Sequence, residues 1–302
     1  MNLFIFSFKM KVFFKNLGFI LLILLCSLYI LDLAYTYSYK NPIYPRNTVS
    51  WLKSGKLIAE KYDYILFGSS RCAYTINPKQ ILKETGLHGV NLGYSSCNAF
   101  EIKLMVKDFL KEHHTNKIFI QVDHEFNNEL TDVLAIVPWM PFVKELSIYE
   151  DILKVDKTIK FKKIIPFYRY MYYDSELGFR NLVLSFFKPN SFELKDGFVP
   201  INGSIKEDLP SVVYNLENKE NIHFKEIIAI CKEKNVEVNF FTAPYYNSKI
   251  NSAVFEKNLP NYTNFSASVE SPYLFKDNSH LNVKGAKMFT TIFSNSCLRF
   301  TE

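Results

Sequence analysis

The pattern of apolar and polar positions begins with one long apolar segment. Residues 17–31 are almost entirely apolar, and apolar neighbours extend the stretch to the roughly 20 residues that a helix needs to cross a bilayer. Lys9, Lys11 and Lys15 precede it without an acidic neighbour, and Asp32 follows it. By the positive-inside rule we expect a single-pass membrane protein, its N-terminus cytoplasmic and its remainder periplasmic or extracellular. No small-residue cleavage site follows, which favours a retained anchor over a cleaved signal peptide.

Behind the anchor, apolar runs alternate with amphipathic segments. Four short runs, at residues 64–67, 90–93, 117–123 and 236–242, are typical of buried parallel strands. Helices are expected after Asn77-Pro78 and after the Asn98–Glu101 capping box, and over about 217–234 and 283–294. This alternation predicts an α/β fold, a flavodoxin-like parallel sheet of about four to five strands with helices on both faces.

Three parts follow from these patterns. Residues 1–37 are the cytoplasmic N-terminus and transmembrane anchor, 38–60 are a linker and lead-in, and 61–302 form one domain. Residues from about 130 to 215 interrupt the alternation and are rich in aromatics and lysine. We interpret them as an inserted lid or subdomain whose aromatic residues serve packing.

Composition narrows the function classes. Hydrophobic residues make up 48% and aromatic residues 16%, which excludes a disordered chain. The net charge of +6 lies partly before the apolar segment, and no basic run interleaved with aromatics marks a nucleic-acid groove. The five cysteines have no zinc-ligand spacing, so we expect neither a metal nor another cofactor. Cys72 and Cys97 follow adjacent strands, and either form a disulfide or are two small buried residues.

Candidate chemistry follows the predicted strands, where ligands of open α/β sheets bind. The residues there are Gly68-Ser69-Ser70-Arg71, Gly93, Asp123-His124-Glu125 and Tyr245, with Asp277 and His280 just before the last helix. A serine near the start, with an aspartate and a histidine three residues apart near the end, supplies a nucleophile, a base and the acid that orients the base.

These residues also resemble a known family. Gly68-Ser69-Ser70, Asn91-Leu92-Gly93 and Asp277-x-x-His280 resemble, in this order, three blocks of the SGNH (GDSL-like) hydrolase superfamily. The closer resemblance is to its membrane-anchored branch associated with cell-surface polysaccharides, over about residues 60–125 and 236–296. The resemblance implies Ser70 as nucleophile, His280 as base and Asp277 as orienting acid. It also implies that the backbone N–H groups of Ser70 and Gly93 form an oxyanion hole.

The chain departs from the family at the third block. That block usually supplies an Asn to the oxyanion hole, whereas here the strand ends in Gln121-Val122-Asp123. A carboxylate would repel an oxyanion, so either another donor serves or the hole is weaker; losing one donor costs about 100- to 1,000-fold in rate. Asp123, His124, Tyr245 and Arg71 remain candidates for substrate binding, and His124 is a rival base. Arg71 either binds an anionic substrate group or pairs with a carboxylate.

Two functions are compatible with this sequence. The first is an anchored serine esterase or O-acyltransferase acting on cell-surface or exported glycans, with a membrane-bound O-acyltransferase as the partner that the resemblance suggests. The second is a catalytically inactive SGNH-like accessory subunit of a polysaccharide biosynthesis or export complex.

Overall fold

The computed structural model describes residues 2–57, 61–190, 192, 195–207 and 209–298, with side chains from residue 10 onward. The chain forms two compact units. The helical unit comprises residues 1–43 and 139–187, and the sheet unit comprises residues 44–138 and 188–302. The side chain of Lys9, which contributed to the expected topology, lies outside the described residues.

The helical unit contains the long apolar helix α1 (Asn2–Lys40) and a group of short helices. Within α1, Met10–Lys40 is long and apolar enough to cross a membrane, so one candidate transmembrane span near the N-terminus is confirmed. The short helices are α6 (Leu146–Val155), α7 (Ile159–Ile164), α8 (Tyr168–Tyr172), α9 (Asp174–Leu177) and α10 (Phe179–Phe187). Where the sequence predicts an insertion over about 130–215, the structure assigns the narrower segment 139–187 to this unit.

The sheet unit is built on five parallel strands in the order β2-β1-β3-β5-β7. These strands are β1 (Lys61–Phe67), β2 (Gly89–Asn91), β3 (His114–Gln121), β5 (Glu237–Thr242) and β7 (Tyr262–Asn264). The predicted α/β fold with a parallel sheet is therefore confirmed. A separate parallel pair joins β4 (Val212–Tyr214) to β6 (Ser248–Ile250).

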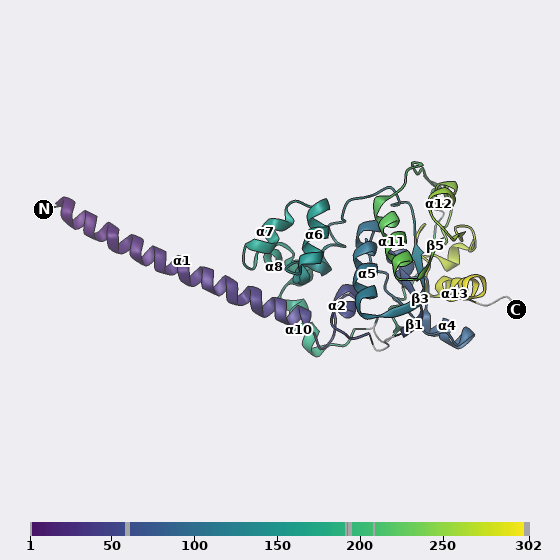
Figure 1. Cartoon of the computed structure of the whole chain (residues 1–302), viewed down its shortest axis with the longest axis horizontal. Helices are drawn as coiled ribbons and strands as arrows, with labels where there is room; N and C mark the ends of the chain where they lie inside the picture. The colour runs from purple at the N-terminus through teal and green to yellow at the C-terminus, as the bar shows by residue number, and fades with distance from the viewer. Residues whose placement is uncertain (1, 58–60, 191, 193–194, 208, 299–302) are drawn as a thin grey trace. The chain divides into compact units, whose positions relative to one another are not determined.

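Helices cover both faces of the sheet (Figure 1). On one face α5 (Ala99–Glu112) packs against α11 (Ile222–Glu233), and Phe109 contacts Phe67 of β1 with ring centroids 6.0 Å apart. On the other face α4 (Pro78–Thr85) packs against α13 (Val283–Cys297), and Phe293 contacts Phe119 of β3 at 5.1 Å. Burial of these aromatic faces holds the sheet, and with it the ends of its strands, in place.

The helix ends follow the local sequence. Asn77 accepts a hydrogen bond from the Lys79 N–H, Pro78 occupies the first turn of α4, and Gly86 ends that helix with φ of 78°. The capping box of Asn98 and Glu101 begins α5. The structure starts α11 at Ile222, later than the expected 217, because its capping residue is Asn221.

Candidate functional site

Ser70 stands where β1 turns into the short helix α3 (Ser70–Ala73). Gly68 makes the turn with φ of 155°, and a Cβ there would lie 2.7 Å from the Gln121 Cβ and 2.8 Å from the Cys72 Cβ, so only glycine fits. Ser69 caps α3 by accepting a hydrogen bond from the Arg71 N–H at 3.3 Å. The turn therefore presents the Ser70 side chain at the carboxyl edge of the sheet.

Asp277 and His280 lie in one short loop before α13. The loop is closed by an antiparallel bridge between Phe275 and Leu281 and by a hydrogen bond from the Lys276 N–H to the His280 carbonyl, 2.8 Å long. Within it Asp277 Oδ1 accepts the backbone N–H groups of Ser279, at 2.8 Å, and His280, at 2.9 Å. The three-residue spacing thus folds the carboxylate back onto the imidazole of its own loop.

The structure brings Ser70, His280 and Asp277 into one hydrogen-bonded series. Ser70 Oγ lies 2.8 Å from His280 Nε2, and His280 Nδ1 lies 3.0 Å from each carboxylate oxygen of Asp277. Burial would raise the pKa of Asp277, but the hydrogen bond to His280 and the Ser279 N–H hold that pKa well below its usual value. An ionised Asp277 only accepts, so Nδ1 carries the imidazole proton and Nε2 accepts from the Ser70 hydroxyl.

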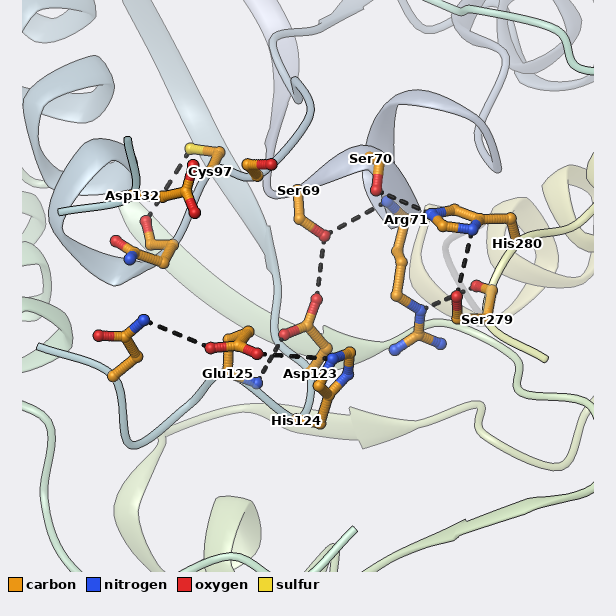
Figure 2. A pocket seen from close by; sticks show the side chains of 13 residues that line it. Ser69, Ser70, Arg71, Cys97, Asp123, His124, Glu125, Asp132, Ser279 and His280 are labelled. Carbon is orange, nitrogen blue, oxygen red and sulfur yellow. Dashed lines mark hydrogen bonds and ion pairs between the residues drawn. The ribbon is translucent and has the colours of Figure 1, made fainter. Parts of the chain in front are cut away.

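Arg71 is buried and bonded to the protein on several sides. Its Nη2 donates to the carbonyls of Ala243, at 2.6 Å, and Pro244, at 2.9 Å, and its Nε donates to the Ser279 carbonyl at 3.0 Å. The guanidinium also stacks 3.4 Å from the centre of the Tyr245 ring. Arg71 therefore ties the end of β5 to the residue beside His280 (Figure 2). It also lines the cavity described below, and its Nη1 has no hydrogen-bond partner among the described residues, so it stays a candidate for substrate binding.

Ser69, Gln121 and Asp123 form a second polar network next to Ser70. The Ser69 hydroxyl lies 2.8 Å from Gln121 Oε1 and 2.9 Å from Asp123 Oδ2. Because it has one proton, it donates a hydrogen bond to only one of these oxygens at a time. Gln121 Nε2 donates to the same Asp123 oxygen at 3.0 Å. Burial alone would raise the pKa of Asp123, but the charge of Arg71 and the hydrogen bond from Gln121 lower that pKa, so Asp123 is held as a carboxylate.

The expected oxyanion hole needs one correction. The Gly93 N–H, expected as a donor, already donates to Asn91 Oδ1 at 3.0 Å, because the Asn91 side chain folds back over the end of β2. Glycine is required here for a different reason: a Cβ would lie 2.8 Å from the Cys72 Cβ and 2.9 Å from the Ala73 N. No hydrogen-bond acceptor for the Ser70 N–H occurs among the described residues, so this amide remains the candidate donor.

His124 and Tyr245 contact each other. His124 Nδ1 is 3.1 Å from the Tyr245 hydroxyl, and its ring stacks on Tyr214 at 4.4 Å. Figure 2 shows the imidazole of His280, and not that of His124, pointing at Ser70. By geometry His280 is the base candidate, and His124 contributes to the wall of the cavity.

A cavity of about 350 Å³ opens in front of Ser70 and His280 (Figure 2). Its lining is mostly polar and includes Asp123, His124, Glu125 and Asp132. Such a lining suits a hydroxyl-rich molecule better than an acyl chain alone. Within the described part of the chain, no group of three or more His, Cys, Asp or Glu side chains is arranged to hold a metal ion.

Cys72 and Cys97 are free, buried thiols. Cys72 Sγ points at Asn91 Oδ1, 3.4 Å away, and burial raises the pKa of both thiols. The open choice between a disulfide and two small buried residues is therefore settled in favour of the latter.

The sequence assigned no role in the site to three residues that contribute to it: Ser69, Gln121 and Ser279. Ser69 and Gln121 hold Asp123, and the Ser279 hydroxyl lies 3.0 Å from Asp277 Oδ1 and 3.1 Å from His280 Nδ1. Each is adjacent to a predicted site residue or two positions from one, which is the only signal the sequence offers.

No family model matches this chain, and no curated protein matches it.

Proposed function

We propose that this protein is a membrane-anchored serine esterase or O-acyltransferase that acts on acyl esters of cell-surface or exported glycans. The observation that carries the proposal is the contact of Ser70 Oγ with His280 Nε2 at 2.8 Å, with Asp277 on the other imidazole nitrogen. The polar cavity in front of these residues supports a sugar-like substrate.

The geometry supports a two-step reaction. Ser70 Oγ attacks the acyl carbonyl while His280 Nε2 takes the hydroxyl proton, and the Ser70 N–H donates to the developing oxyanion. The carbon–oxygen bond to the leaving alcohol then breaks, His280 returns the proton to that alcohol, and the acyl group stays on Ser70. Water or a sugar hydroxyl next attacks this ester while His280 takes its proton, the bond between the acyl carbon and Ser70 Oγ breaks, and His280 returns the proton to Ser70. With water the enzyme is a hydrolase, and with a sugar hydroxyl it is a transferase. Asp277 stabilises the imidazolium in both steps.

The proposed location follows from α1 and its flanking charges. With the lysines before the apolar stretch in the cytoplasm, the sheet unit and the short helices α6 to α10 lie outside, in the periplasm or the extracellular space. Nucleotide-linked acyl donors are cytoplasmic, so acyl transfer needs a membrane partner, such as a membrane-bound O-acyltransferase, to deliver the acyl group.

One observation favours a second function. The Gly93 N–H is bonded to Asn91 and a carboxylate stands at Asp123, which leaves the oxyanion site poor in donors. This arrangement would suit a catalytically inactive accessory subunit of a polysaccharide biosynthesis or export complex.

A fluorophosphonate probe separates the two functions. We expect the purified full-length chain to be labelled at Ser70, and Ser70→Ala to abolish labelling without a change in circular dichroism. Ser69→Ala is the matched control, because Ser69 is the adjacent serine but contacts Asp123 and Gln121 in place of a histidine; it should retain the label. Absence of labelling in the wild-type chain would favour the accessory subunit.

A further inference from the structure

An ion pair fixes the apolar helix to the rest of the helical unit. Arg169 and Asp32 are both buried, with Nη1 2.7 Å from Oδ2 and Nη2 3.0 Å from Oδ1. The Phe167 N–H donates to Asp32 Oδ2 at 3.0 Å, and Lys144 Nζ lies 2.6 Å from Oδ1. A carboxylate at the end of an apolar stretch is therefore partnered by α8 and by turns that flank the short helices.

The same contacts continue along the last turns of α1. Tyr35 meets Phe167 edge to face at 4.9 Å, Thr36 Oγ1 bonds to the Tyr170 hydroxyl at 2.8 Å, and Tyr39 stacks on Tyr170. The turn between α7 and α8 is thus attached at the level of Asp32.

The position of Asp32 along α1 corresponds to one boundary of the bilayer. Lys15 and Asp32 are 17 residues apart by sequence position, which is about 25 Å along a helix at 1.5 Å per residue. The hydrocarbon core is about 30 Å thick, and the long stem of Lys15 reaches beyond its own backbone. If α1 spans the membrane as proposed, the α7–α8 turn lies at the outer surface of the hydrocarbon. Figure 1 shows α7 beside the C-terminal third of α1, nearer to the apolar stretch than α6.

The segment at this level is apolar on its exposed side and basic. We define the apolar rim as five exposed side chains of the α7–α8 region, Phe161, Ile164, Ile165, Met171 and Tyr172; Ile164 is the most exposed, at 69%. Residues 154–172 contain six Lys and Arg and one Asp, and Lys154, Lys157 and Lys160 are exposed. Apolar side chains interleaved with lysines match an interface in which acyl chains lie below anionic headgroups.

We infer that the apolar rim enters the outer leaflet of the membrane, with the neighbouring lysines at the lipid phosphates. This inference rests on the proposed anchoring by α1. It assigns the Asp32–Arg169 pair a mechanical role, because the pair holds α7 at the depth where its exposed apolar side chains meet acyl chains. The occupant of this surface is lipid; a protein partner on the same surface is the competing outcome of the test below.

Tryptophan quenching by brominated lipids tests the inference. Both native tryptophans, Trp51 and Trp139, are buried, so the signal of the unmodified chain is subtracted as a constant. The full-length chain carrying Ile164→Trp is reconstituted in vesicles of phosphatidylcholine and phosphatidylglycerol, with or without bromine near the carboxyl end of the acyl chains. Leu24→Trp, on the exposed apolar side of α1, is the positive control, and Val213→Trp, exposed on β4, is the negative control.

We expect Ile164→Trp to lose emission on bromination and to shift to shorter wavelength, while Val213→Trp keeps its emission. Quenching of Leu24→Trp without quenching of Ile164→Trp would overturn the inference, leave the anchor intact and point to a protein on the rim. Absence of quenching in Leu24→Trp would show that the anchoring proposal itself has failed. Equal quenching of Val213→Trp would also overturn the inference, since contact with lipid would then not be specific to the rim.

Discussion

Replacing Arg71 tests whether this buried guanidinium holds the loop of Asp277 and His280 in position. Arg71→Met keeps most of the side-chain volume but removes the donors to the carbonyls of Ala243, Pro244 and Ser279. It also removes the positive charge that lowers the pKa of Asp123. The variant therefore leaves three carbonyls without these donors and one buried carboxylate without its compensating charge.

The magnitude follows from these losses. At about 1 kcal/mol for each of the three carbonyls, and about 1 kcal/mol for the lost charge near Asp123, the total is about 4 kcal/mol of unfolding free energy. The deficit depends on pH. In the wild-type chain the lowered pKa of Asp123 contributes stability that is present above about pH 4 and is lost as the pH falls through its folded value. Without the charge of Arg71, the pKa of Asp123 is lowered less, so the deficit should be larger at neutral pH than near pH 4.

Urea unfolding provides the assay. Trp51 is buried in the sheet unit against Phe192, so its fluorescence reports on that unit when Trp139→Phe is used as a common background. The exposed Arg180 supplies a matched control, and Arg180→Met should change the unfolding free energy by less than about 0.5 kcal/mol. A loss below about 1 kcal/mol for Arg71→Met, equal at both pH values, would refute the reasoning.

Three further predictions concern the site and its support. Asp277→Asn should leave the fold intact but favour the wrong imidazole tautomer, slowing fluorophosphonate labelling by about 10⁴-fold; an unchanged rate would exclude the triad. Burial raises the pKa of Glu101 to about 7, so the protein loses stability as the pH rises from about 4.3 to about 7 and this carboxyl must ionise. Glu101→Gln should therefore raise the unfolding free energy, measured by urea unfolding, by up to about 3 kcal/mol over wild type near pH 8 and leave it unchanged near pH 4. Gly93→Ala should lower the unfolding free energy by about 2 kcal/mol, since its Cβ would collide with the Cys72 Cβ, and a neutral effect would contradict the close approach described above.

Local sequence signals predicted most of the sheet unit. The run at 64–67 is buried on both faces of the sheet, so an apolar run without alternation was the appropriate signal, and Asn77, Pro78 and Gly86 define a helix through contacts within a few residues. β7 was missed because its residues 262–264 are mostly polar, as an edge strand permits. Its pairing with β5 depends on the sheet already being present.

The candidate site was predictable only where its geometry is local. Asp277 and His280 sit in one loop, so their spacing indicates their contact. The burial of Arg71 depends on carbonyls 172 to 208 positions away, and the bond from the Gly93 N–H to Asn91 depends on a side-chain rotamer that the sequence does not reveal. Both concern what a polar group is bonded to, and a pattern of residue types carries little of that information.

The sequence separation between Ser70 and His280 has a consequence for the order in which the candidate site assembles. Asp277 and His280 are three positions apart, whereas the bond between Ser70 and His280 joins residues 210 positions apart. The chain also leaves the sheet unit after Pro138 and returns to it at Lys188. Contacts between such distant residues form only after the intervening chain has been made and folded. During synthesis Ser70 therefore emerges long before His280, and under the proposed function a Ser70 that reacts with a fluorophosphonate would mark a chain whose folding is complete.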